Sequence, residues 1–519
     1  MQLPANLRLI DLSQSLPIDI IPAGKIIEVT MIDNLFNLSI DGEIKYQRLF
    51  GPLLLSSNSD LEIVELNRKG MPAKYKGMIE IRGINKENLF NVINVIDMQN
   101  YLRGVVPNEM PVSFGLEALK AQAIAARNYA TNAQINPNYD VVDSTASQVY
   151  YGVNSYKDIA DYAVYETNGI YALYQNRPIS ALYFSTSAGI TDDWDDIFGD
   201  GNVSNKHPYL KSRVDFENQK RIKTEDDVIE FLSKKDNGLD INSPKFRWEV
   251  EFDRIELEEI LHTTLQQQSK AGLVQPKYDG DIKLYGLKEI KPIKRTQSGK
   301  IIELEINAKS GVYKIKKELG IRRVLKKNNS MLPSSVFYVE TSGNEKLNDD
   351  ENNDQTVEEE GIIRLFDFSS HEKYPQKFKF IGGGFGHGVG MSQFGAYNLA
   401  KAGKKYPEIL NHYYTDIKFS TMPKVVSYNE FNYAQKVEFY YDSKIFKEVW
   451  LYIDNPRNAS EFPFRINEYE FLETRTVSPR ASIKIDIKQY LKNGVNFVEF
   501  APLSRENRNR DIEYRVEFQ

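Results

Sequence analysis

A single glutamate, Glu109, lies between two prolines, Pro107 and Pro111, and an alanine-rich run follows it over residues 117–130. Proline restricts its own backbone and that of the residue before it, so the carboxylate sits on backbone with little freedom. A carboxylate held in this way suits a general acid or base presented to a cleft. A glutamate near a helix start also serves as a cap or as a partner of the helix dipole. The segment alone leaves both interpretations open.

The second unusual segment is rich in glycine and contains one histidine. Six glycines between Gly382 and Gly390 surround His387, and a helix is expected from Ser392 to Lys401. Glycine is kept where the chain needs positive φ or where another group approaches the backbone closely. The segment lacks the Gly-Lys-Ser/Thr of the phosphate-binding loops. A tight turn with a structural histidine is the alternative interpretation.

Together these segments resemble the SpoIID/LytB family, which comprises stage II sporulation protein D and its relatives among bacterial cell-wall enzymes. The matching pieces occur in family order over about residues 6–420. They are residues 101–110, 117–123, 143–150, 183–189, 208–210, 332–337, 386–395 and 409–415.

The resemblance implies a peptidoglycan lytic transglycosylase, a lyase that cuts the MurNAc–GlcNAc bond and forms a 1,6-anhydro product. In that reaction one residue protonates the leaving oxygen and then takes the proton of the 6-hydroxyl, so Glu109 is expected to be the sole general acid/base. Its pKa must be raised for the acid step. Four neighbouring apolar residues are expected to form the wall that raises it: Val105, Val106, Met110 and Phe114.

The resemblance also implies that the glycine-rich loop places His387 near Glu109, where it would orient substrate or stabilise developing charge. Other polar residues of the matching segments are expected to contact sugar or acetamido groups, or else to hold helix to loop. They are Gln122, Arg127, Gln148, Tyr150, Ser185, Thr186, Ser187, Ser392 and Gln393.

Two other functions remain open at this point. One is a non-catalytic enhancer that binds peptidoglycan and activates an amidase, as LytB-type relatives are named for. The other is a hydrolysing glycosidase, which usually needs two carboxylates, with Asp143 as the second. We expect the partners to be peptidoglycan glycan strands and, in the enhancer case, another wall hydrolase such as an amidase.

No cofactor or metal is expected. Some family members bind a metal through a histidine that directly follows the tyrosine of the Tyr-x-Ser-Thr segment, together with cysteines. Here that position is Phe184 and the chain has no cysteine. His207, near several aspartates, is weak grounds for a zinc site. Chelation should therefore leave activity unchanged.

Composition narrows the partners and the compartment. The net charge of −6 gives no electrostatic support for binding nucleic acid. No apolar run reaches the about 18 residues of a membrane span, and the first residues have no charged region followed by an apolar stretch. Since enzymes of this kind act outside the cytoplasm, we expect an extracytoplasmic protein whose signal or anchor is missing from this sequence, with Met1 added.

The pattern of elements predicts an α+β protein with several parts. Alternating strands with turns such as Asp41-Gly42 fill the N-terminal part, and Asp97 is expected to cap a helix over residues 98–105, followed by a helix entered at Ser113. A strand is expected over residues 178–185. The expected parts are a β-rich region 1–96, a core region 97–222, an inserted α+β subdomain 223–380 with an acidic loop 343–361, the loop and helix 381–422, and a β-sandwich 424–519.

The last part has repeated short strands split by turns, which is typical of a β-sandwich. Residues 483–498 resemble strands of galactose-binding-like jelly rolls, so a carbohydrate-binding module is possible. Its strand aromatics would stack on sugars or lie in its core: Tyr440, Tyr441, Trp450 and Tyr452. Because it has enough apolar residues for its own core, we expect the rest to fold without it.

Overall fold

A computed structural model gives the fold, and it describes residues 6–14, 16–84, 88–199, 206–215, 222–281, 283–346, 373–426, 435–454, 464–469, 482–500 and 512–519. Most of the expected acidic loop 343–361 lies outside the described residues. The chain is a mixture of helices and mainly antiparallel sheets, which confirms the α+β class. It forms two compact units. The first comprises residues 1–181, 403–409 and 416–519, and the second residues 182–402 and 410–415.

The first unit begins with small antiparallel sheets. A five-stranded sheet has the order β10-β9-β6-β1-β2, beside the meander β3-β4-β5 and the hairpin β7-β8. Asp41 and Gly42 form the predicted turn between β4 and β5, both with positive φ. The strands are β1 (Leu7–Asp11), β2 (Leu16–Ile21), β3 (Ile27–Ile32), β4 (Leu35–Ile40), β5 (Glu43–Leu49), β6 (Leu53–Ser56), β7 (Leu61–Arg68), β8 (Met71–Tyr75), β9 (Met78–Ile84) and β10 (Leu89–Val95).

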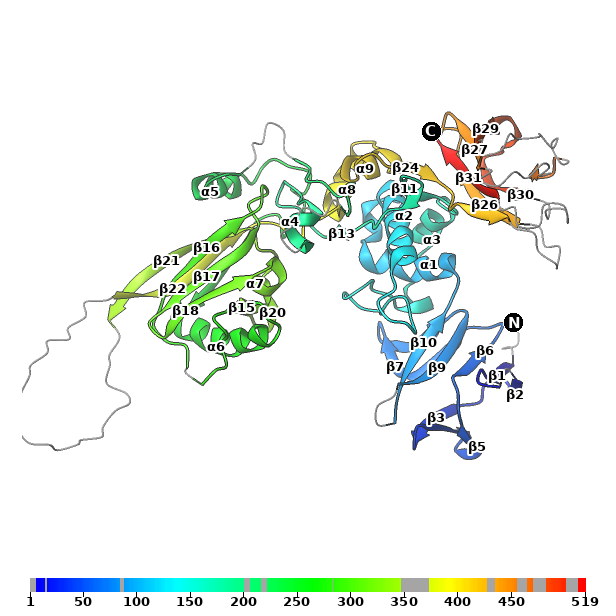
Figure 1. Cartoon of the computed structure of the whole chain (residues 1–519), viewed down its shortest axis with the longest axis horizontal. Helices are drawn as coiled ribbons and strands as arrows, with labels where there is room; N and C mark the ends of the chain where they lie inside the picture. Colours follow the sequence, from blue (N-terminus) through cyan, green and yellow to red (C-terminus); the bar gives the residue numbers. More distant parts are fainter. Residues whose placement is uncertain are drawn as a thin grey trace, which may run out of the picture. The chain divides into compact units, whose positions relative to one another are not determined.

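Three helices follow these sheets and lie side by side (Figure 1). They are α1 (Met98–Glu109), α2 (Leu116–Asn132) and α3 (Asp158–Tyr165). Five of the six alanines of α2 are fully buried, so its backbone is closely covered by neighbouring elements. Two 3-10 turns, η1 (Val112–Phe114) and η2 (Gly152–Ser155), complete this region.

The N-terminus of α2 differs from the prediction. Ser113 lies inside η1, and α2 begins at Leu116 after Gly115, whose φ is 87°. A residue at this backbone angle is best a glycine, so the turn rather than a serine cap sets the start of the helix.

The C-terminal strands form two packed sheets. One contains β27 (Val449–Asp454), β29 (Ser482–Asp486) and β31 (Ile512–Phe518), with β25 (Lys424–Val426) paired to β31. The other has the order β26-β30-β28, formed by Gln435–Tyr441, Gly494–Phe500 and Phe464–Ile466. Rings meet between the sheets, since the centroids of Phe439 and Phe518 are 5.5 Å apart. This agrees with a sandwich, while the jelly-roll topology stays a prediction.

The sandwich shares a sheet with the helical region of the first unit. Strand β31 pairs with β24 (Lys418–Ser420), and β24 pairs with β11 (Tyr171–Tyr174), so one sheet runs from the sandwich to the helical region. The same sheet ends at β12 (Arg177–Pro178). The alternating pattern predicted the strands correctly but carried no information on which strand lies at the edge of which sheet.

The second unit is built on two larger antiparallel sheets, and its described residues include the five helices α4 to α8. One sheet has the order β14-β22-β21 (Trp248–Asp253, Lys373–Gly382, Phe337–Lys346) and the other β15-β18-β17-β16 (Val274–Gln275, Gly311–Lys316, Ile301–Ala308, Leu287–Arg295). Leucines of α6 (Arg254–Lys270) and residues of α7 (Glu318–Val324) pack with these strands in one core. Figure 1 shows α6 beside β15 of the second sheet. Helix α5 (Glu225–Ser233) and the short hairpin β19-β20 (Lys326–Lys327, Ser330–Met331) belong to the same unit.

The glycine-rich loop follows β22 in this unit. It leads to β23 (Met391–Ser392) and to the predicted helix, α8 (Gln393–Lys401). Ser392 lies just before this helix and caps it by accepting from the Gly395 N–H. Strand β23 pairs in parallel with β13 (Tyr183–Phe184). The strand expected over residues 178–185 is therefore reduced to β12 and β13, and α4 (Trp194–Phe198) follows. Helix α9 (Tyr406–Tyr413) comes last.

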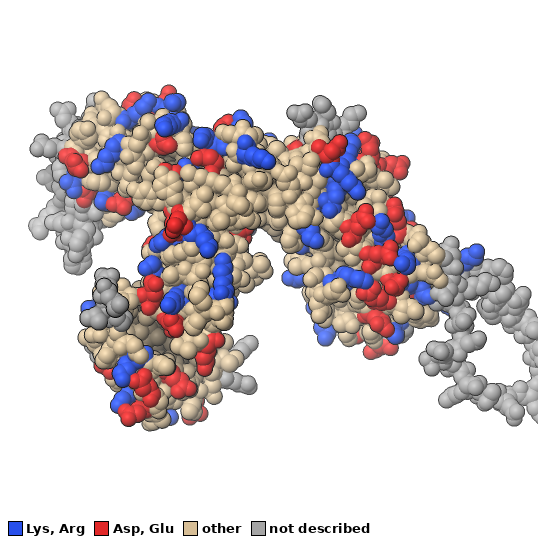
Figure 2. All heavy atoms as spheres, turned by 180° about the vertical axis from the view of Figure 1, so that it is seen from behind, with Lys and Arg blue, Asp and Glu red and all other residues tan. Residues whose placement is uncertain are grey.

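Acidic and basic side chains are interspersed over the face shown in Figure 2. Among the described helices, none is both long and apolar enough to cross a membrane.

Candidate active site

Glu109 is the last residue of α1. Asp97 caps the helix by accepting from the Asn100 N–H, as predicted, but the helix continues through Pro107 for four residues more than expected. Met110 then adopts an extended backbone, with φ −129° and ψ 130°. A residue before proline favours this conformation, so Pro111 ends the helix one residue after Glu109 and fixes where the carboxylate emerges.

The carboxyl of Glu109 is partly buried and accepts one strong hydrogen bond. The Val149 N–H donates to its Oε1 at 2.6 Å. Burial raises its pKa from the ordinary 4.5 to about 6, and the Val149 bond opposes that rise only in part. The four residues expected to form an apolar wall are all buried in this unit. A carboxyl with a pKa near 6 holds a proton at mildly acid pH and still ionises, as a general acid/base must.

Two tyrosines experience the charge of Glu109. Burial and, to a smaller extent, the Glu109 charge raise the pKa of Tyr101, whose hydroxyl donates to Gln148 Oε1 at 3.0 Å. Burial likewise raises the pKa of Tyr129, which bonds to Ser147. Both phenols therefore stay neutral beside the carboxyl, and Glu109 is the group here that titrates at mildly acid pH. Sequence analysis did not identify Tyr129 as a neighbour of Glu109.

Asp143, the candidate second carboxylate, forms an ion pair with Arg68. Arg68 belongs to the β7 strand of the N-terminal hairpin, far away in sequence. A general base that activates water would have to leave this guanidinium. Sequence analysis missed Arg68 because nothing in its surroundings distinguishes it from an exposed strand residue.

The other predicted contact residues of this unit join helix to loop. All four are buried: Gln122, Arg127, Gln148 and Tyr150. Arg127 donates to the Ile170 carbonyl at 2.9 Å, and Tyr150 donates to Asn94 at 2.7 Å. A buried side chain has no surface to offer a sugar, so these residues support the site, and contact with substrate remains only a prediction for them.

Five polar residues predicted near the glycine-rich loop lie in the second unit, and four are buried: Thr186, Ser187, Ser392 and Gln393. Ser392 donates to Asp240, which also accepts from the Ser187 N–H at 2.8 Å. Thr186 bonds to Ser243 at 2.7 Å and to Ser185 at 3.0 Å. Only Ser185 of the five is partly exposed.

His387 lies in the same unit, whereas Glu109 lies in the first unit, so their expected proximity stays a prediction. Both ring nitrogens bind backbone: Nε2 donates to the Tyr183 carbonyl at 3.0 Å and Nδ1 accepts from the Val389 N–H at 3.1 Å. Burial, with the nearby Lys300 charge, lowers its pKa to about 3. Because both nitrogens of this neutral imidazole are hydrogen-bonded to backbone, His387 can offer its ring for contact but does not carry a proton.

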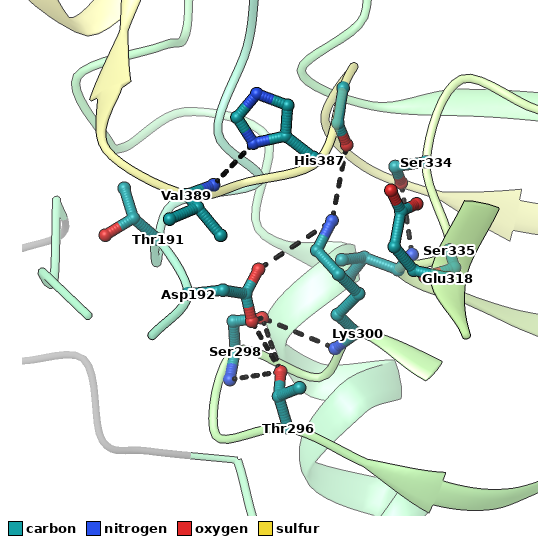
Figure 3. Close-up of polar contacts among 12 residues, drawn as sticks. Thr191, Asp192, Thr296, Ser298, Lys300, Glu318, Ser334, Ser335, His387 and Val389 are labelled. Atoms are coloured by element: carbon teal, nitrogen blue, oxygen red, sulfur yellow. Dashed lines mark hydrogen bonds and ion pairs between the residues drawn. The ribbon is translucent and has the colours of Figure 1, made fainter. Parts of the chain in front are cut away.

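A buried ion pair supports the loop from the other side of its backbone (Figure 3). Lys300 Nζ lies 3.7 Å from Asp192 Oδ2 and 3.4 Å from the Gly386 carbonyl. Asp192 Oδ1 accepts from the hydroxyls of Thr296 and Ser298, each at 2.6 Å. Burial raises the pKa of Asp192 to about 6, although Lys300 and the hydroxyls oppose the rise. Sequence analysis missed this pair because its residues lie on distant segments.

Phe184 replaces the metal-binding histidine of some relatives, and its ring packs 5.5 Å from that of His387. The described residues contain no group of three or more histidine, cysteine, aspartate or glutamate side chains placed to hold a metal. His207 instead bonds through Nδ1 to the Tyr209 hydroxyl at 2.8 Å.

Comparison with known proteins defines the class. Residues 86–174 match the family model of SpoIID, the stage II sporulation protein. This range contains α1, Glu109 and α2. A second family model, a domain of unknown function (DUF8618), matches residues 198–354, which include Lys300 and most of the β-sheets of the second unit.

Several relatives extend this match. The amidase enhancer of Bacillus subtilis strain 168 is 30% identical over 325 residues, which are 60% of this chain and 39% of the relative. Stage II sporulation protein D of Bacillus amyloliquefaciens is 27% identical over 351 residues, 64% of this chain and 76% of the relative. The same protein of Bacillus subtilis is 28% identical over 345 residues. Residues 86–174 therefore belong to the SpoIID family, as the motifs predicted, although the chain spans only 39% of the amidase enhancer.

Proposed function

We propose that the protein is a peptidoglycan lytic transglycosylase that uses Glu109 as its only general acid/base. The observation that carries this proposal is the pKa of Glu109, raised to about 6 by burial at the end of α1. The SpoIID match around this residue supports the wall polymer as substrate. The same match supports a location outside the cytoplasm.

The reaction needs two proton transfers, one from Glu109 and one back to it. Protonated Glu109 donates to the glycosidic oxygen, the bond from MurNAc C1 to that oxygen breaks, and the GlcNAc hydroxyl leaves. The carboxylate then takes the proton of the MurNAc 6-hydroxyl as O6 bonds to C1. This closes the 1,6-anhydro ring, restores protonated Glu109 and consumes no water.

Neighbouring groups adjust the pKa of the Glu109 carboxyl, and the carboxyl itself transfers the protons. The Val149 N–H stabilises the charged form between the two transfers, and the buried wall favours the protonated form before the first. His387 is not expected to carry a proton, since its nitrogens are already bonded to the Val389 N–H and to the Tyr183 carbonyl.

The decisive experiment is mass spectrometry of glycan strands digested by wild type and by Glu109→Gln. The wild type should release anhydro-ended fragments, and the variant should be about 10²–10⁴-fold slower. Glutamine is close in size but carries no proton to exchange, so binding should survive. Activity of the variant within a few-fold of wild type contradicts the assignment.

Asp143→Asn is the matched variant for the hydrolase alternative. A transglycosylase that relies on Glu109 alone should retain its activity and its anhydro products in this variant. Reducing ends in the wild-type digest, lost in Asp143→Asn, would establish a two-carboxylate hydrolase instead.

The amidase-enhancer alternative has its own observation, the 30% identity to a protein of that name. It predicts no glycan cleavage at all, together with faster release of stem peptides when an amidase is added. The same digests, repeated with and without amidase, measure both.

A further inference from the structure

A row of aromatic rings runs along the second unit from the glycine-rich loop. It consists of Phe184, His387, Phe198, Trp194 and His207, called here the aromatic row. Successive ring centroids are 5.5, 5.5, 6.1 and 4.6 Å apart. These distances lie within the usual range for rings in contact, so the five rings form one continuous apolar strip.

Local structure fixes the outer half of the row. Helix α4 places Trp194 and Phe198 four residues apart, on the same face of its single turn. The backbone N–H of Trp194 donates to the Leu210 carbonyl at 3.1 Å, and the backbone N–H of Ser212 donates to Asp193 Oδ1 at 2.6 Å. These bonds tie α4 to the segment that carries His207.

The row is accessible to a ligand. The Phe198 side chain is 41% exposed, and Trp194, His207 and His387 are partly exposed. Burial and the Lys206 charge lower the pKa of His207, so its ring is less readily charged than that of an ordinary histidine. Exposed aromatic surface, here at Phe198 with Trp194 beside it, marks a binding surface more often than it serves stability.

We propose that the aromatic row binds the glycan chain of the substrate, with hexopyranose rings stacked by their C–H faces on Trp194 and Phe198. This rests on the proposed function for the substrate class. A pyranose has an apolar C–H face and polar edges, so it matches a strip of rings that lies beside polar groups. Lys206, whose ammonium lies 5.9 Å from the Trp194 ring centroid, adds a positive charge for the lactyl carboxylate of MurNAc, which is free in stem-free strands.

The same reasoning disfavours the aromatics first expected to bind sugar. The Lys484 ammonium lies 3.9 Å from the ring centroid of Trp450, and the Trp450 indole donates to Glu448 at 3.1 Å. Tyr441 is buried, and Tyr440 bonds to Glu166. Lys206 lies farther from the Trp194 ring centroid, at 5.9 Å, than Lys484 lies from that of Trp450, and Trp194 is adjacent to the exposed Phe198.

The three tryptophans of the chain make the test specific. Glu109→Gln protein is titrated with stem-free MurNAc–GlcNAc strands and with a GlcNAc hexamer, while tryptophan fluorescence and calorimetry are recorded. Fluorescence should change on binding, and the change should vanish in Trp194→Phe but persist in Trp450→Phe. Trp248, 6% exposed, should contribute no response.

Affinity gives the second readout. Trp194→Ala and Phe198→Ala should each raise the Kd at least 10-fold, with an unchanged melting temperature. Tyr285→Ala is the control, since Tyr285 is an exposed aromatic of the same unit outside the row. Lys206→Gln should weaken the binding of the MurNAc-containing strands and leave the binding of the GlcNAc hexamer unchanged.

The outcomes are separable from those of the proposed function. Wild-type affinity in both Trp194→Ala and Phe198→Ala overturns the aromatic row, whatever Glu109 does. Cleavage retained by Glu109→Gln overturns the acid/base assignment, while the binding series still reports on the row. A fluorescence response that follows Trp450 would assign sugar binding to the C-terminal sandwich instead.

Discussion

At the residue scale, the Glu109 carboxyl combines partial burial with a strong hydrogen bond from the backbone. Asp143 pairs with the Arg68 guanidinium, whereas the Val149 amide donates to Glu109. A neutral donor stabilises the carboxylate without abolishing its basicity, which both proton transfers require.

The raised pKa of Glu109 predicts a pH-dependent stability. Since folding raises it from 4.5 to about 6, the wild type should lose stability relative to Glu109→Gln as pH rises from about 4.5 through about 6. The difference should reach about 2 kcal/mol above that range and vanish below it. Urea unfolding of both proteins at pH 4, 5, 6 and 7 measures it, and a pH-independent difference contradicts the pKa.

The sequence was informative about this residue for a local reason. Two prolines and a helix end lie within a few residues of Glu109, so its backbone could be predicted from neighbours. Its partner is the amide of Val149, which any residue except proline would supply, and no residue type reveals that. Likewise Lys300 is one of many lysines, and only the tertiary fold places it in a buried pair.

At the element scale, the glycine-rich loop depends on a segment outside the glycine motif. The turn at Thr296–Lys300 between β16 and β17 supplies the groups that surround Asp192 (Figure 3). This turn lies in the region matched by the domain of unknown function. We infer that the segment holds the loop in place as part of the second unit.

This support predicts that Gly388 tolerates no side chain. A Cβ there would lie 2.4 Å from Asp192 Oδ2 and 2.9 Å from Lys300 Cε, at a φ of +85°. Gly388→Ala should cost about 3–5 kcal/mol of unfolding free energy, from backbone strain and overpacking together.

Gly403→Ala is the matched control. Gly403 has a φ of +87° but no atom within 4 Å of an added Cβ, so only the backbone cost of about 1–2 kcal/mol remains. Chemical denaturation measures the unfolding free energy of both variants. Equal losses would show that Asp192 and Lys300 shift to accommodate the methyl group.

Elements were predicted well where one sequence pattern sets them and poorly where tertiary contacts do. The cap at Asp97, the turn at Asp41 and the helix after Ser392 were correct because side-chain chemistry decides each. The expected strand over residues 178–185 was wrong over its middle. Its two ends pair with different partners, β11 and β23, and period-two alternation cannot show that.

At the scale of the whole molecule, the C-terminal strands complete the sheet of the first unit. Besides the pairing of β31 with β24, Phe446 packs 6.2 Å from Tyr406 and 6.4 Å from Phe419, measured between ring centroids. The Tyr440 hydroxyl donates to Glu166, which forms an ion pair with Lys120 of α2 at 2.6 Å. The sandwich thus covers apolar and polar groups of the SpoIID-family region.

Deleting residues 424–519 should therefore destabilise the remaining chain, in contrast to the expectation from sequence. The deletion leaves β24 as an open edge and exposes Phe419 and Tyr406, which favours aggregation. Phe446→Ala tests the same contact without the deletion. It should cost about 3–5 kcal/mol as a large-to-small change in a core, whereas Tyr469→Ala, at an exposed ring, should cost little. Thermal melting with size-exclusion chromatography measures both, and a monomeric truncated chain that melts within a few degrees of wild type would show that the sandwich is dispensable.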